Sequence, residues 1–107
     1  MKYIIPQEKF KHIIFKYIDD KFNIFDTVYS KQYHDSKFYT LNGRIMAELI
    51  PTQQVVILDY DFWEELFNMF SFKKTSEFQK IMKEWANHRF DWENSIIDFY
   101  GFEGSEI

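Results

Sequence analysis

Residues 37–50 read KFYTLNGRIMAELI and place an Asn-Gly pair between two apolar, β-favouring runs. Asn42 and Gly43 tolerate the two positive φ angles of a type I′ turn. The stretch therefore predicts a β-hairpin whose strands are residues 37–41 and 44–50. Because antiparallel strands need a second layer to bury their apolar face, this hairpin sets the expectation for the rest of the chain.

A two-residue turn also predicts the register of the hairpin. It pairs Leu41 with Arg44, Tyr39 with Met46, and Lys37 with Glu48. The last pair joins opposite charges, which agrees with that register. The side chains that this alternation turns toward the core are Phe38, Thr40, Ile45, Ala47 and Leu49.

The sequence before and after the hairpin predicts further strands and three helices. Apolar residues at helical spacing predict a helix over 6–21, and alternation predicts a strand over 24–33. A further strand is expected over 54–59, because it holds the unbroken apolar run Val55-Val56-Ile57-Leu58. Two more apolar stripes predict helices over 62–71 and from 75 to about 89.

The order of these elements indicates an α+β fold. We expect an N-terminal helix, an antiparallel sheet of three or four strands, and two C-terminal helices packed on one sheet face. The length of 107 residues fits a single domain over 1–107, with a body of residues 1–90 and an acidic aromatic tail of residues 91–107. On this interpretation the tail can be deleted while the body stays folded.

Composition excludes several classes of protein. Hydrophobic residues make up 46% of the chain and aromatic residues 21%, which is not the composition of a disordered protein. The chain has no cysteine, so disulfides and thiolate metal sites are excluded. The apolar run 55–58 is too short to cross a bilayer, and the charged start predicts no signal peptide. We therefore expect neither secretion nor a membrane partner.

Charge is distributed unevenly along the chain. Residues 1–90 hold 13 basic and 12 acidic side chains, whereas residues 91–107 hold five acidic side chains and no basic one. A nucleic-acid-binding domain normally carries a basic excess, so no nucleic-acid partner is expected. An acidic segment at a terminus is typical of an interaction tail.

Motifs of catalysis are sparse. The three glycines form no phosphate-binding loop, and His12, His34 and His88 lack the spacing of a helical metal site. Asp59 and Asp61 follow a buried strand, where two carboxylates could hold a divalent ion or simply bracket the start of a helix. We expect no cofactor, no metal and no enzyme activity, and keep a small metal-dependent hydrolase as the least favoured alternative.

Aromatic residues flanked by acidic ones are concentrated near the C-terminus. Such residues are typical anchors of protein–protein interfaces. An equally open interpretation is that the segment folds back over the sheet. The candidate partner-binding residues are Trp92, Asp98, Phe99, Tyr100, Phe102 and Glu103.

Residues 47–92 resemble small uncharacterised proteins of tailed bacteriophages. The resemblance lies in the run VVIL at 55–58, the aromatics Phe62, Trp63, Phe67 and Phe70, and the segment 77–81 with Trp85. It implies a phage or mobile-element origin and a location in the host cytoplasm or the virion. We expect a non-enzymatic accessory protein that binds and modifies or inhibits a host protein. The alternative is a virion or assembly subunit, which could form a homo-oligomer.

Overall fold

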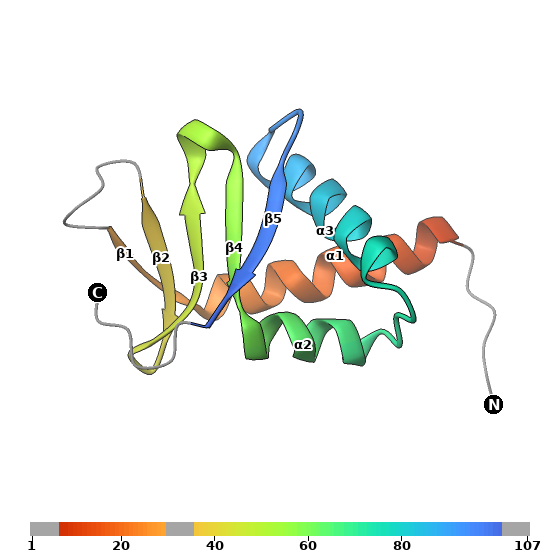
Figure 1. Ribbon diagram of the computed structural model, residues 1–107, viewed down its shortest axis with the longest axis horizontal. Helices are drawn as coiled ribbons and strands as arrows, with labels where there is room; N and C mark the ends of the chain where they lie inside the picture. Colours follow the sequence, from red (N-terminus) through yellow and green to blue (C-terminus); the bar gives the residue numbers. More distant parts are fainter. Residues whose placement is uncertain (1–6, 30–35, 102–107) are drawn as a thin grey trace.

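The computed structural model describes residues 7–29 and 36–101 (Figure 1). Its elements confirm the α+β class. In chain order they are α1 (Gln7–Ile24), β1 (Asp26–Tyr29), β2 (Lys37–Leu41), β3 (Arg44–Ile50), the short 3-10 helix η1 (Pro51–Gln53), β4 (Val55–Asp59), α2 (Tyr60–Met69), α3 (Thr75–Phe90) and β5 (Ile96–Tyr100).

The five strands form one mixed sheet in the order β1-β2-β3-β4-β5. Strands β1 to β4 pair antiparallel, as predicted, and β5 pairs parallel with β4. The expectation of a purely antiparallel sheet with three or four strands is therefore wrong in its last strand. Parallel neighbours need a long crossover, and α2 and α3 supply it between β4 and β5.

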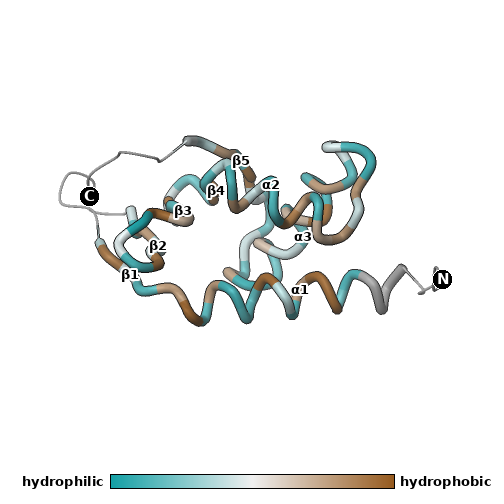
Figure 2. The backbone as a smooth tube through the Cα atoms, turned by 90° about the horizontal axis from the view of Figure 1, so that it is seen from below, coloured by the Kyte–Doolittle hydropathy of each residue, from teal (hydrophilic) through white to brown (hydrophobic). Residues whose placement is uncertain are grey.

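The helices and one face of the sheet share a single core. Figure 2 shows α1 and α3 on one side of the sheet, and α2 continues from the end of β4 beside them. Phe22 of α1 joins the layers, because its ring centroid lies 4.8 Å from that of Tyr39 in β2 and 4.9 Å from that of Trp85 in α3. Trp85 is fully buried. The sheet face used by the C-terminal helices is thus also the face of α1.

The hairpin has the predicted bounds but a different register. Leu41 pairs with Arg44 as expected, whereas Tyr39 pairs with Ala47 and not with Met46. Lys37 likewise faces Leu49 in place of Glu48. The cause is a β-bulge, an extra residue in one strand that shifts all pairs beyond it.

The bulge also changes which side chains face the core. Tyr39 enters the core cluster, and Ala47 and Leu49 join it as predicted. Phe38 is only half-buried, so its predicted core position is wrong. Thr40 and Ile45 are buried, but they pair with each other beyond the register shift and lie outside the core cluster, so their burial does not confirm the predicted core face.

Residues 91–101 do not form a tail that is separate from the body. Asp91 ends α3 in a left-handed conformation with a φ of 58°. The backbone then enters β5, where the Ile96 N–H donates to the Gln54 carbonyl at 2.8 Å. The predicted acidic tail is therefore wrong for residues 96–100, because non-local pairing with β4 makes them a strand of the sheet. Residues 102–107 lie outside the described residues.

Candidate functional site

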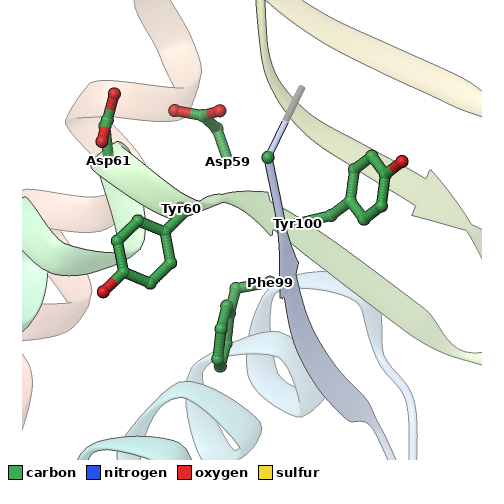
Figure 3. Close-up of a pocket in the computed structure, with 6 residues that line it drawn as sticks. Asp59, Tyr60, Asp61, Phe99 and Tyr100 are labelled. Carbon is green, nitrogen blue, oxygen red and sulfur yellow. The ribbon is translucent and has the colours of Figure 1, made fainter. Parts of the chain in front are cut away.

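A hollow of about 450 Å³ lies where β4 and β5 end (Figure 3). The two strands are parallel, so both finish at the same edge of the sheet, with Asp59 opposite Tyr100. In sheets with parallel strands, ligands commonly bind at the carboxyl ends of the strands. The residues that line the hollow are Asp59, Tyr60, Asp61, Phe99, Tyr100 and Gly101.

One guanidinium links the two carboxylates of the hollow. Arg44 begins β3 directly after the Asn-Gly turn, and its Nη2 lies 2.7 Å from Asp59 Oδ2 and 2.8 Å from Asp61 Oδ2. The hydrogen bond to Asp61 and the charge of Asp59 raise the pKa of Arg44. The Asp59 side chain is 2% exposed, whereas that of Asp61 is 67% exposed. Asp59 therefore has an internal ion pair, while Asp61 faces solvent.

The side chain of Asp59 does not cap α2. Asp59 is the N-cap residue of α2, yet its side chain makes no capping hydrogen bond. Its carboxylate accepts from Arg44 across the sheet. The Asp59–Arg44 pair thus fastens the hairpin turn to the junction of β4 and α2.

The aromatic side of the hollow rests on a buried tryptophan. The Phe99 ring lies 4.8 Å from Trp63 and 5.6 Å from Tyr60, and the Tyr60 ring stacks on Trp63 at 6.2 Å (centroid distances). Trp63 is buried, and its indole N–H has no hydrogen-bond partner in the described part of the chain. Tyr60, Phe99 and Tyr100 are 45%, 41% and 59% exposed. Their rings therefore present apolar surface around the opening.

The structure brings together only some of the predicted partner-binding residues. Phe99 and Tyr100 line the hollow. Asp98 lies next to them but accepts a hydrogen bond from the Phe99 N–H at 2.8 Å. Trp92 lies in the connection between α3 and β5, half-buried, with its ring centroid 4.8 Å from that of Phe90. The roles of Phe102 and Glu103 stay predictions, since both lie outside the described residues.

Sequence reasoning missed Arg44 and Tyr60 as parts of the site. A signal for Tyr60 exists in the sequence, because it stands between Asp59 and Asp61 at the end of the apolar run. No local pattern marks Arg44, which reaches the two carboxylates of the hollow because β3 lies beside β4.

A divalent-metal centre is poorly supported at this hollow. Within residues 7–29 and 36–101, no three His, Asp or Glu side chains gather as metal ligands do. Asp59 and Asp61 accept hydrogen bonds from the same guanidinium, with which a metal ion would have to compete. His88 stacks with Phe15 at a centroid distance of 6.1 Å, away from the lining residues.

Side chains cover part of the outer edge of β5. The Ile96 N–H bonds toward β4, so the backbone groups of Ile97 and Phe99 point to the opposite side. There the Ile97 carbonyl accepts from Gln79 Nε2 at 3.3 Å, and the Phe99 N–H donates to Asp98. Occupied edge groups disfavour the addition of a foreign strand.

Comparisons with protein-family models, curated proteins and solved structures give no match to this chain. Among the helices of the described residues, none has the length and apolar composition that crossing a bilayer requires.

Proposed function

We propose that this chain is a non-enzymatic protein-interaction module that docks a partner protein at the hollow where β4 and β5 end. The observation that carries this proposal is the group of exposed rings of Tyr60, Phe99 and Tyr100 around one opening. Aromatic side chains are enriched among the residues that contribute most to interface energy. The buried Trp63 packs against the rings of Tyr60 and Phe99, which restricts their motion and lowers the entropy lost on binding.

Electrostatics supports the same proposal. Asp61 and Asp98 lie beside the rings and are exposed. Such a surface steers diffusional encounter toward a basic patch on a partner. Together with the resemblance of residues 47–92 to tailed-phage proteins, this favours a phage or mobile-element accessory protein that binds and modifies or inhibits a host protein.

The contacts of β5 favour docking through side chains. Gln79 and Asp98 occupy edge groups that an added strand would need. A partner that meets this edge therefore finds the rings of Phe99 and Tyr100 and the carboxylate of Asp61. We expect an interface with aromatic anchors and a polar rim.

Affinity capture from a host lysate tests the proposal when the wild-type chain is compared with Tyr60→Ala and Tyr100→Ala. The matched control is Tyr29→Ala, because Tyr29 is 71% exposed and lies on β1, at the other edge of the sheet. We expect both hollow variants to lose the captured protein and the control to retain it. Equal capture by all four chains would show that docking occurs elsewhere.

A second candidate function is that of an assembly subunit. Tyr29 of β1, which is 71% exposed, offers another apolar surface at the sheet edge opposite β5. Two separate patches on one chain allow head-to-tail association. Sedimentation equilibrium distinguishes the candidates: an oligomer that Tyr29→Ala dissociates supports assembly, and a monomer at high micromolar concentration contradicts it.

A further inference from the structure

We infer that the hollow where β4 and β5 end receives a positively charged side chain of the partner, with an arginine guanidinium as the best fit. This inference rests on the proposed function and specifies the chemistry of the group that docks. Three observations support it: the charge of the lining, the ring faces at the opening, and the exposed carboxylate of Asp61.

The lining of the hollow is negatively charged. It contains Asp59 and Asp61 and no basic residue. Arg44 lies against both carboxylates and compensates one of the two charges. The net local charge is therefore −1, which favours a cationic guest and disfavours an anionic one.

The rings provide the second recognition element. A guanidinium is attracted to the face of an aromatic ring and stacks on it, and Arg does so more often than Lys. The chain already uses this contact internally, since the Arg89 guanidinium lies 5.6 Å from the Phe22 centroid and 5.8 Å from that of Phe90. Tyr60 and Tyr100 both line the hollow with exposed rings, which lie on opposite sides of the end of β5 in Figure 3, so either ring can offer a face to a guest.

Asp61 provides the ionic partner. Arg44 binds its Oδ2, and the side chain is 67% exposed. A carboxylate has two acceptor oxygens, so Oδ1 can accept from a guest while Oδ2 keeps Arg44. A guanidinium presents several N–H donors in one plane, which allows it to bind Asp61 and stack on a ring at once.

The direct test is an NMR titration of the full chain with acetyl-Gly-Arg-Gly-amide. The control peptide carries citrulline in place of arginine, which keeps the shape and removes the charge. We expect the arginine peptide to shift the amide signals of Tyr60, Asp61, Tyr100 and Gly101, and the citrulline peptide to bind at least fivefold more weakly. Equal binding of the two peptides, or shifts confined to other residues, would overturn the inference.

A charge-removing variant completes the test. Asp61→Asn should weaken binding of the arginine peptide about fivefold, the effect of losing one partly exposed ion pair. The matched control is Asp20→Asn, which removes an exposed carboxylate that pairs with Lys16 on α1. Unchanged binding by Asp61→Asn would contradict the inference. If arginine selectivity fails while Tyr100→Ala still loses the captured protein, the proposed function stands and only the chemistry of the docked group is wrong.

Discussion

At the scale of single residues, Asp19 shows how a side chain of ordinary appearance joins the helical layers. Its Oδ1 accepts from Trp85 Nε1 at 2.9 Å and from Arg89 Nη1 at 2.8 Å. Both donors come from α3, about 70 residues further along the chain. The neighbouring Asp20 pairs only locally, with Lys16. Nothing in the sequence separates the two adjacent aspartates, because the difference depends on where α3 packs.

Replacement of Asp19 tests this role. Asp19→Ala leaves the indole N–H of the fully buried Trp85 without its acceptor, which should lower the free energy of unfolding by about 2 kcal/mol. Asp20→Ala, the control, should change it by less than about 0.5 kcal/mol, since it breaks only an exposed i,i+4 pair. Urea denaturation followed by tryptophan fluorescence measures both. Similar losses in the two variants would contradict the assigned role.

At the scale of elements, some features of the fold follow from neighbouring residues and others depend on contacts between distant parts of the chain. The hairpin over 37–41 and 44–50 could be predicted to the residue, because an Asn-Gly turn is encoded by the two residues themselves. Its register could not, because the two turn residues carry no signal for the shift that lies between Tyr39 and Thr40. Strand β5 was missed for a similar reason. Residues 96–100 can pair with β4 only because α2 and α3 carry the chain back to that strand.

The turn itself yields a test. Gly43 has a φ of +82°, a region that costs a residue with a Cβ atom about 1 kcal/mol. Gly43→Ala should therefore destabilise the protein by about that amount, although a Cβ at this position would meet no atom within 4 Å. Gly101→Ala is the matched control, because its site is equally open and its φ is not positive. Equal stability of the two variants in a thermal melt would show that the turn tolerates the side chain.

Deletion of residues 91–107 distinguishes a strand from a tail. The deletion removes β5, which covers Val56 and Leu58 through its parallel pairing and packs Phe99 on Trp63. We expect the shortened chain to lose its cooperative thermal transition, since a small domain has only about 5–15 kcal/mol of stability to lose. Deletion of residues 102–107 alone keeps every described contact of β5 and serves as the control. A cooperative melt of the larger deletion would restore the tail interpretation.

At the scale of the whole molecule, the candidate site could be predicted in part. The sequence points to Phe99, to Tyr100 and to the Asp59–Asp61 pair, but as unrelated features. The sheet unites them because β4 and β5 end at one edge. Trp92 shows the opposite outcome: an acidic neighbourhood suggested exposure, yet the ring packs beside Phe90. Charge patterns along a chain do not encode which face of a ring the fold will cover.

The side chains that cover the outer edge of β5 are expected to limit self-association of the whole molecule. The double variant Gln79→Ala with Asp98→Ala removes the side chains that occupy the Ile97 carbonyl and the Phe99 N–H. Unprotected edge strands pair with other chains, so we expect concentration-dependent self-association. Sedimentation velocity at several concentrations measures this self-association. The control is Asp20→Ala, which changes an exposed side chain on α1. If the double variant sediments like the wild-type chain, features other than these two side chains prevent the edge of β5 from pairing with another chain.

The two walls of the hollow come from chain segments about 40 residues apart, around Asp59–Asp61 and Phe99–Gly101. The hollow has both walls only after the crossover has returned the chain to β4. A nascent or partly unfolded chain therefore has no recognition surface to offer, and its partner would select mature copies only. By thermodynamic linkage, the same partner would raise the melting temperature of the protein, and the rise would continue as the ratio of free partner concentration to Kd increases.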